Sequence, residues 1–273
     1  MELKIRWSGV EALGRSLTNL QQREIPFAVV KGLTRTAKDI QTAEVEEIKS
    51  VFDRPKPWTL RSVFVKPATK SDFTAAVWLK DDATYVNYAG KIVGGNVGKS
   101  GTPAAKYLLP QIYGGGRNLK RFEMVLQYAN VLPPGMYCVP GGGADLDVYG
   151  NIKAGQIIQI ISYFRGFREE GYRSNITNAR KAKLKKPTAK RSGYEYFAIK
   201  TTNGRFGRNL KPGIYRRTNF NLSGSAIKPI VMFVRKPTYQ PRFDFFGVAD
   251  KVANQMMMRN VQAALDDALK NPR

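Results

Sequence analysis

The chain of 273 residues contains no histidine, and this absence removes several catalytic classes at once. Without histidine there is no Ser-His-Asp triad, no imidazole general base and no histidine-ligated zinc. Chemistry based on lysine, carboxylate or tyrosine stays open, and so does a magnesium site built from oxygen ligands. Any enzymatic activity would have to rest on those groups.

Cysteine is nearly absent as well. The single cysteine, Cys138, lies in the segment GMYCVPGGG among apolar and turn-forming residues. One cysteine excludes an intramolecular disulfide framework, and without histidine it cannot form a Cys-His nucleophilic pair. We therefore expect Cys138 to be a buried structural thiol.

Long hydrophobic runs are also missing. The longest candidate, IIQIISYF at residues 157–164, contains Gln and Ser and is far shorter than the roughly 18 residues that a membrane span requires. The first residues, MELKIRWSG, carry an acidic side chain and no long apolar stretch, so no secretory signal is expected. Apolar residues make up 42% of the chain, enough for a buried core. We expect a folded protein of the cytoplasm, with no membrane partner.

Acidic residues are scarce relative to basic ones. The chain has 45 Lys and Arg against 21 Asp and Glu, a net charge of +24, which indicates a polyanionic partner such as nucleic acid or an acidic protein surface. The densest basic segment, residues 165–191, holds ten basic and two acidic residues. We expect it to contact DNA or an acidic partner, although a solvated loop is the alternative. Its basic residues are Arg165, Arg168, Arg173, Arg180, Lys181, Lys183, Lys185, Lys186, Lys190 and Arg191.

A glycine-rich segment, GGNVGKS at residues 94–100, has the appearance of a phosphate-binding loop. That motif requires G-x-x-x-x-G-K-[ST] and a helix that opens at its end. Counting back from Gly98, the first glycine would have to be residue 93, which is Val93, so the loop is one residue short. A helix could begin only at Pro103. We therefore expect a flexible loop and no nucleotide cofactor.

A basic protein could also cleave the nucleic acid it binds, and metal-dependent phosphodiester cleavage requires carboxylates. The pairs nearest to one another are Asp81 with Asp82, Asp145 with Asp147, and Glu169 with Glu170. Two-metal hydrolysis needs several carboxylates that converge on the ions, and none of these pairs belongs to a recognisable spaced motif. We expect no catalytic and no metal site, with a nuclease as a minor alternative.

Aromatic residues alternate with basic ones in part of the basic segment. Tyr163, Phe164, Phe167 and Tyr172 lie close in sequence to Arg165, Arg168 and Arg173. Such a pattern is typical of proteins that stack aromatic rings on single-stranded bases. The same aromatic residues could instead cover a local hydrophobic core, and the sequence favours this second interpretation.

Hydrophobic periodicity predicts two long amphipathic helices, at residues 26–52 and 243–269. We expect Pro26 at the first helical position, and Pro55 and Pro57 to end the first helix. Apolar residues recur on one face of each helix and are expected to face the core or a neighbouring subunit. They include Phe27, Val30, Leu33, Phe245, Val248, Val252 and Met256.

Alternating segments predict strands at residues 2–7, 63–65, 73–79, 194–200, 213–217 and 227–234. A helix is expected over residues 8–20, and shorter ones over 103–112, 119–128 and 153–163. The predicted fold is α+β, with a small, mostly antiparallel sheet packed against the two long helices. Residues 1–82 and 194–273 would form this core domain, and residues 83–193 a basic, loop-rich helical insertion. The insertion's own core would contain Tyr107, Leu108, Phe122, Leu126, Val131, Ile157, Ile160 and Ile161.

Three segments carry a resemblance to a known family: IPFAVVKGLTRTAKDIQ, PGIYRRT, and KPIVMFVRKPTYQPRFDFFGVADKVA. Their order resembles the tail-completion proteins of tailed bacteriophages, the minor tail protein Z-like group at the head–tail junction. The matching pieces are residues 25–28, 212–215 and 229–234. Residues 106–126 and 132–162 are similar to uncharacterised proteins of phage structural operons. The large insertion departs from the simpler members of the family.

The resemblance implies a non-enzymatic virion component that forms a homo-oligomeric ring between the portal region and the tail. Its partners would be other phage neck, portal and tail proteins and the DNA in the lumen, and it would be assembled in the host cytoplasm. The alternative is a nucleic-acid-binding protein that uses residues 165–191 as its main functional surface.

Overall fold

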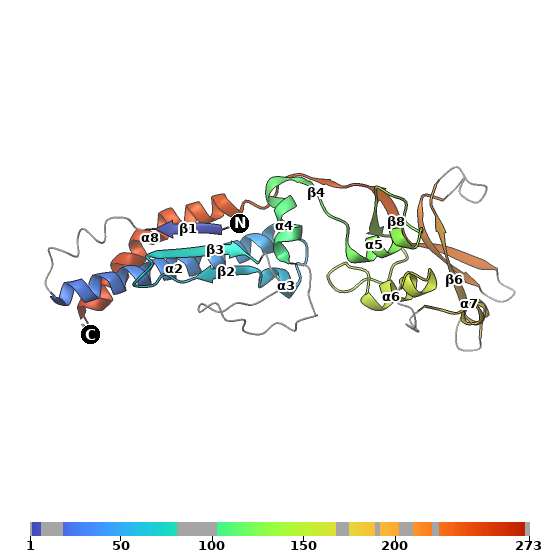
Figure 1. The fold of residues 1–273 in the computed structure, drawn as a ribbon, viewed down its shortest axis with the longest axis horizontal. Coiled ribbons are helices and arrows are strands. Elements are labelled where there is room, and N and C mark those ends of the chain that lie inside the picture. The colour runs from blue at the N-terminus through green and yellow to red at the C-terminus, as the bar shows by residue number, and fades with distance from the viewer. Residues whose placement is uncertain are drawn as a thin grey trace. The chain divides into compact units, whose positions relative to one another are not determined.

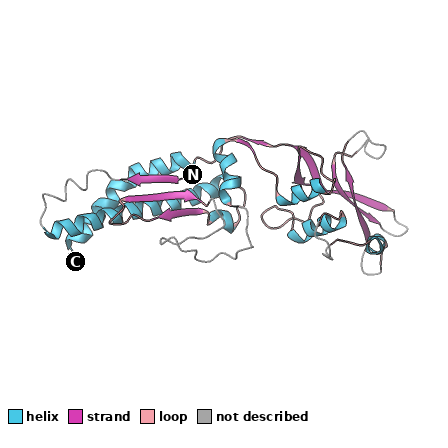
Figure 2. Ribbon diagram, in the orientation of Figure 1, coloured by secondary structure: helices cyan, strands magenta, loops and turns pink. Residues whose placement is uncertain are grey.

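The computed structural model describes residues 2–6, 19–80, 103–167, 175–188, 192–201, 210–219 and 224–270. The chain divides into two compact units (Figure 1). Unit 1 comprises Met1–Gly115 and Tyr239–Arg273, and unit 2 comprises Gly116–Thr238. The expected α+β class is confirmed, because small antiparallel sheets occur together with a long helix near each end of the chain (Figure 2).

Unit 1 contains a three-stranded antiparallel sheet in the order β1-β3-β2. Its central strand pairs Ala75 with Ile5 of β1 and Val77 with Val65 of β2. Ile5, Ala75 and Val77 are all buried in the core of unit 1, which explains why these short strands carry β-branched and small apolar residues. The strands span Glu2–Arg6 (β1), Val63–Lys66 (β2) and Thr74–Leu79 (β3).

Two long helices, α2 (Asn19–Val51) and α8 (Phe245–Lys270), pack along each other, and α2 also contacts β2 and β3 (Figure 1). Fully buried side chains recur along α2, among them Leu33, Ile40 and Ile48, at a spacing that keeps them on one helical face. The two ends of the chain therefore build one hydrophobic core.

The predicted start of the first long helix is wrong. Pro26 lies inside α2, which begins at Asn19. A proline at an interior position removes one backbone hydrogen bond and costs about 3 kcal/mol. Ala28 and Val29, immediately after it, are buried. Burial of this helix face offsets the cost of the interior proline. The preference of proline for the first helical position therefore gave the wrong start for this helix.

Two shorter helices complete unit 1: α3 (Pro57–Leu60) and α4 (Ala104–Tyr113). Arg242, just before α8, donates from Nε to Gln111 Oε1 of α4 at 2.7 Å, and its backbone N–H donates to the Gln111 carbonyl. Tyr107 and Leu108 of α4 pack into the core of unit 1. The prediction that they belong to a separate core of the insertion is therefore wrong.

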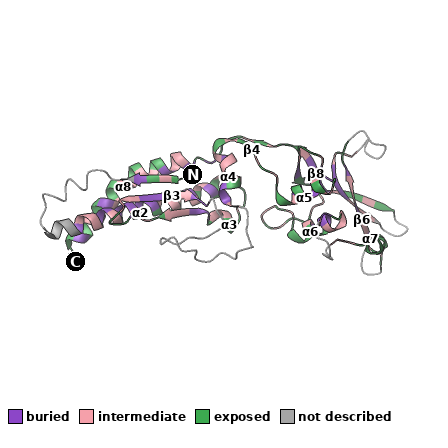
Figure 3. Cartoon of the chain, in the orientation of Figure 1, coloured by how far each residue is buried: buried purple, intermediate pink, exposed green. Residues whose placement is uncertain are grey.

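Unit 2 contains a four-stranded antiparallel sheet in the order β5-β8-β7-β6. Its core is formed by buried residues of the sheet, of α5 and α6, and of the loop after α5 (Figure 3), including Leu126, Ile160, Tyr196, Ile230 and Phe233. The elements are α5 (Arg121–Tyr128), β5 (Met136–Pro140), α6 (Ala154–Tyr163), α7 (Asn178–Lys185), β6 (Gly193–Ile199), β7 (Gly213–Asn219) and β8 (Ser225–Arg235). The chain passes between the units twice, at the paired short strands β4 (Gly115–Gly116) and β9 (Thr238–Tyr239).

The predicted domain division is therefore corrected. The strands expected at 194–234 do not extend the sheet of residues 63–79. They form their own sheet with β5, and residues 83–193 are not a separate insertion. The sequence hid β5, because Met136–Pro140 lies within a glycine- and proline-rich segment that is typical of turns. Alternation identifies a strand but does not identify its partner in the sheet.

The apolar helix-face residues are used inside unit 1 to different degrees. Leu33 and Phe245 are fully buried, whereas Val30 and Val252 pack against the core while partly exposed. Phe27, Val248 and Met256 are half-buried. None of the helices in the described part of the chain has the length and apolar character needed to span a bilayer.

Candidate nucleic-acid interface

Positive charge is concentrated in unit 2. Residues 116–238 include 23 basic and six acidic residues, a net charge of +17, whereas the remaining 22 basic and 15 acidic residues give unit 1 a net charge of +7. An uneven distribution of this size produces a strong local potential that attracts polyanions. Unit 2 is therefore the part of the chain best suited to contact a polyanion.

The most buried carboxylate of unit 2, Glu123, has a structural role. It forms an ion pair with Arg117 and accepts hydrogen bonds from the backbone N–H groups of Lys120 (2.6 Å) and Cys138 (2.7 Å). Burial raises the pKa of Glu123, but the hydrogen bonds and the positive charge of Arg117 lower it overall. The same environment leaves Cys138 buried, as expected, and burial raises its thiol pKa to about 12.

The carboxylates considered for a nuclease site are also part of the scaffold where they are described. Asp147 Oδ1 accepts from the backbone N–H groups of Tyr149 (3.0 Å) and Asn151 (2.9 Å), which closes a tight loop. Asp145 Oδ2 accepts from Gln156 Nε2 at 3.0 Å. Asp81, Asp82, Glu169 and Glu170 lie outside the described residues. Within the described ranges, no group of three or more acidic or cysteine side chains is arranged to hold a metal ion.

Part of the predicted basic segment forms a helix, α7, which the sequence pattern did not indicate. Thr177 caps it, because its Oγ1 accepts from the Arg180 N–H at 3.2 Å. Arg180, Lys183 and Lys186 of this segment are exposed. Arg168, Arg173, Lys190 and Arg191 lie outside the described residues, as do residues 94–100 and most of the helix expected at 8–20.

The end of α7 is attached to the edge strand β6. The Lys185 carbonyl approaches Gly193 so closely that a Cβ atom at that position would overlap it. Lys185 Nζ also pairs with Glu195 Oε2 at 2.9 Å, and Arg217 Nη1 pairs with Glu195 Oε1 at 3.1 Å. Glycine at residue 193 and this ion pair therefore fix the helix against the sheet.

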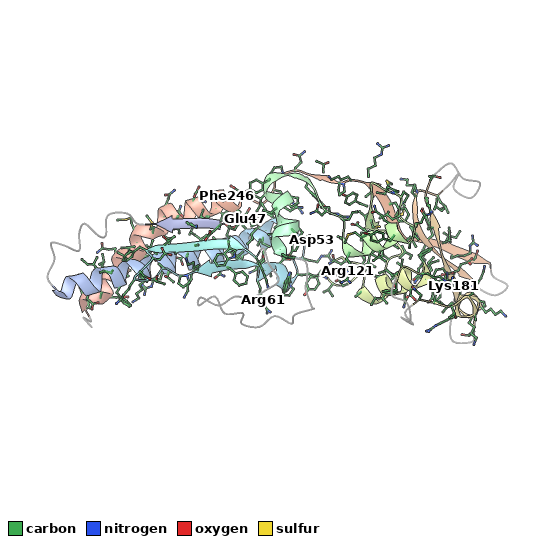
Figure 4. All side chains as sticks on the ribbon, viewed as in Figure 1. Glu47, Asp53, Arg61, Arg121, Lys181 and Phe246 are labelled. Atoms are coloured by element: carbon green, nitrogen blue, oxygen red, sulfur yellow. The ribbon has the colours of Figure 1, made fainter. Side chains whose placement is uncertain are left out.

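Two further basic residues of the segment, Lys181 and Arg165, contact other side chains of unit 2. Lys181 Nζ lies 4.6 Å from the centre of the Tyr163 ring, a cation–π contact, and Figure 4 shows its position on α7. Burial and the nearby Arg165 charge lower the pKa of Lys181. Arg165 Nη2 donates to Asn178 Oδ1 at 2.7 Å. These contacts hold α7 next to the end of α6.

A pocket of about 760 Å³ lies between α6, α7 and β6. Its apolar wall comes from Ile158 of α6, from Ile176, which precedes α7, and from Leu184 of α7. Arg180 and Gln159 provide polar groups to the lining. The volume falls in the range of about 300–1,000 Å³ that is typical of ligand pockets.

Three tyrosines provide the aromatic part of the pocket. The rings of Tyr163 and Tyr196 meet edge to face with their centres 5.4 Å apart, and those of Tyr194 and Tyr196 do so at 5.7 Å. Tyr194 and Tyr196 lie two residues apart on β6 and so share one face of the strand. Burial raises the pKa of Tyr163 and of Tyr196, so both hydroxyls ionise less readily than that of an ordinary tyrosine.

The sequence located one of these aromatic residues and missed two. Tyr163, predicted as a possible stacking residue, lines the pocket, whereas Phe164 packs against the core of unit 2. Phe167 is half-buried, and Tyr172 lies outside the described residues. The sequence pattern predicts Tyr194 and Tyr196 only as residues of a strand. The spacing Tyr-Glu-Tyr beside a basic segment was the available signal.

Comparisons with known proteins do not identify a relative: no family model, no curated protein and no solved structure matches the chain.

Proposed function

We propose that this protein is a non-enzymatic structural component of a tailed-bacteriophage particle, of the tail-completion type, at the head–tail junction. In this role it forms a ring with other copies of itself, contacts portal, neck and tail proteins, and is assembled in the host cytoplasm. The proposal rests first on the resemblance of the sequence to that family.

The architecture of unit 1 is the observation that supports the proposal best. Helix α2 near the start of the chain and α8 near its end pack against each other and accompany a small antiparallel sheet. This is the arrangement that the resemblance implies. A body of this kind, stabilised by its own core, leaves its outer surfaces available for neighbouring subunits in a closed ring.

Unit 2 adds a strongly basic surface to that body. Its net charge of +17 suits contact with the DNA that fills or passes through a connector, or with the acidic surface of an adjoining protein. Contacts with phosphates are independent of sequence and sensitive to salt. They need exposed Arg and Lys side chains, which Arg180, Lys183 and Lys186 provide.

A second candidate function is nucleic-acid binding as the main activity, without a structural place in the particle. The observation that favours it is the pocket of unit 2, where aromatic rings and basic side chains occur together. Proteins that bind single strands combine these two features. In that case the isolated monomer would bind nucleic acid tightly.

Deletion of the gene, followed by negative-stain imaging of the particles, tests the first proposal. We expect heads and tails that fail to join, and restored joining when the gene is supplied in trans. Normal heads with normally joined tails would refute it. Replacing the exposed basic residues of α7 separates the two candidates: a loss of DNA affinity with normal particles favours the second function, and faulty assembly with unchanged DNA affinity favours the first.

A further inference from the structure

The pocket between α6, α7 and β6 has aromatic and apolar walls. A surface that only attracts phosphates would not need such walls. It needs exposed Lys and Arg. Here α7 contributes Leu184 and Arg180 to the lining of a half-open pocket with aromatic and apolar walls, and Lys181 lies above the Tyr163 ring.

We infer that this pocket binds one unstacked nucleotide of a single-stranded nucleic acid, with the base among the tyrosines and the phosphate at Arg180. The inference rests on the polyanion-facing role proposed for unit 2, and it is independent of where the protein lies in a particle. It names the partner as single-stranded rather than double-stranded.

The base side of the site is formed by Tyr163, Tyr194 and Tyr196, with Ile158 and Leu184 at the edges. Aromatic rings stack on any base, because each base has a π-face, and each such contact strengthens binding at least about fivefold. Tyr194 is half-buried, and its ring is braced edge to face by Tyr196 at 5.7 Å. A braced ring loses little conformational freedom on binding, so more of the stacking energy appears as affinity.

The polar side of the site is formed by Arg180 and Gln159. Both line the pocket, and both are exposed, so they lie at its rim. An Arg guanidinium matches the geometry of a phosphate and can donate two parallel hydrogen bonds to it. The Gln159 amide offers one acceptor and two donor hydrogens to a base edge, which tolerates different bases.

Single strands fit this pocket better than the alternatives do. The bases of a duplex are stacked and paired inside the helix, so a base can enter a pocket only after it has been unpaired and unstacked, which is unfavourable. An acidic peptide with an aromatic side chain would also meet a basic, aromatic site. However, the charge of unit 2 is spread over many positions, which suits a polymer with a charge at every unit.

The test compares two oligonucleotides that carry the same phosphates. Fluorescence anisotropy would measure the full chain binding to labelled oligothymidylate of about 12 nucleotides and to an abasic strand of equal length. We expect oligothymidylate to bind about tenfold more tightly, and this difference to persist at about 0.15 M salt, where phosphate attraction is weakened. Equal affinities would overturn the pocket inference while leaving the polyanion role intact. No binding to either strand would refute both.

Matched variants test whether the pocket causes the difference in affinity between oligothymidylate and the abasic strand. Tyr194→Leu should abolish most of the preference for thymidylate without changing the affinity for the abasic strand, whereas Tyr194→Phe, which keeps the ring, should retain the preference. Arg180→Ala should weaken binding of both strands more than Lys183→Ala, which removes the same charge from the same helix outside the pocket. If Tyr194→Leu leaves the preference unchanged, the inference is wrong.

A second measurement uses the unmodified protein, so its result does not depend on whether a variant folds. Photocrosslinking of the unmodified protein to an oligonucleotide that contains 5-iodouridine, followed by mass spectrometry, should place crosslinks on Tyr163, Tyr194 or Tyr196. Crosslinks confined to other parts of the chain would contradict the inference. Tighter binding of an acidic, tyrosine-containing peptide than of oligothymidylate would also overturn it and indicate a protein partner.

Discussion

Gly32 of α2 lies directly against Val261 of α8. A Cβ atom on Gly32 would lie 2.6 Å from Val261 Cγ2 and 2.7 Å from Val261 Cα, closer than such atoms can approach. The absence of a side chain at residue 32 therefore lets the two long helices come together. This contact joins segments that are more than two hundred residues apart in the chain, and it stabilises the core of unit 1.

We predict that Gly32→Ala destabilises unit 1. Alanine is the better helix former by about 1 kcal/mol, but the new methyl group would push against the backbone of α8, at a cost of about 1–3 kcal/mol. Thermal unfolding followed by circular dichroism measures the change. Gly155→Ala in α6 is the matched control, because a Cβ atom there meets nothing within 4 Å, and this variant should be neutral or slightly stabilising. A Gly32→Ala protein as stable as the wild type would contradict the packing.

Glu44 predicts a dependence of stability on pH. Its side chain is fully buried in unit 1, and neither carboxylate oxygen has a hydrogen-bond partner in the structure. Burial first, and then the charges of Glu47 and Asp244, raise its pKa from 4.5 to about 9 (Figure 4 labels Glu47). The folded state thus keeps a proton that the unfolded state releases between these two values.

The free energy of unfolding should therefore fall as the pH rises from about 4.5 towards 9, by up to about 1.4 kcal/mol per pH unit. Glu44→Gln, which has the shape of the neutral acid, should remove this slope and be more stable than the wild type at neutral pH. Urea unfolding at several pH values measures both. The exposed Glu46→Gln is the control and should keep the wild-type slope. Parallel slopes for the wild type and Glu44→Gln would show that Glu44 is ionised in the folded state.

Replacing Glu123 should destabilise unit 2 strongly. Glu123→Gln leaves the Arg117 guanidinium, whose side chain is only 13% exposed, without its carboxylate partner. Loss of one partner of a buried pair costs about 3–5 kcal/mol. Because the pKa of Glu123 is lowered in the folded state, its contribution is present at neutral pH and is lost as the pH falls through that lowered pKa.

Denaturant unfolding of Glu123→Gln measures this loss. Glu195→Gln provides a comparison, because its partners Lys185 and Arg217 have exposed side chains, and this change should cost less than about 1 kcal/mol. A cost for Glu123→Gln no larger than that for Glu195→Gln would contradict the structural role of the buried pair.

The exposed basic residues at α7, Arg180 and Lys183 within the helix and Lys186 directly after it, should determine the salt dependence of polyanion binding. We expect the triple variant Arg180→Ala, Lys183→Ala, Lys186→Ala to bind oligothymidylate more weakly than the wild type. Its slope of log affinity against log salt should be smaller by up to about 2, since each single-strand phosphate contact contributes about 0.7. Lys251→Ala, which removes an exposed charge from α8 in unit 1, is the control and should leave the slope unchanged. An unchanged slope in the triple variant would place the polyanion surface elsewhere.

The sequence predicted individual elements well and their assembly poorly. Periodic apolar residues identified both long helices and most strands, because burial of one face determines those patterns. The sequence could not show that Tyr196 and Ile230 share a core with Leu126, because the order of strands in a sheet depends on pairing between segments far apart in the chain. For the site, composition indicated a polyanion partner, and only the fold brought Tyr163 next to Tyr194 and Tyr196.

One measurement tests the central claim directly: electron cryo-microscopy of intact particles, with the chain located at the junction between head and tail. The account predicts a closed ring of copies of this chain there, in which surfaces of unit 1 form the contacts between subunits and unit 2 faces DNA or an acidic neighbour. Particles whose head–tail junction is complete without this chain would contradict it.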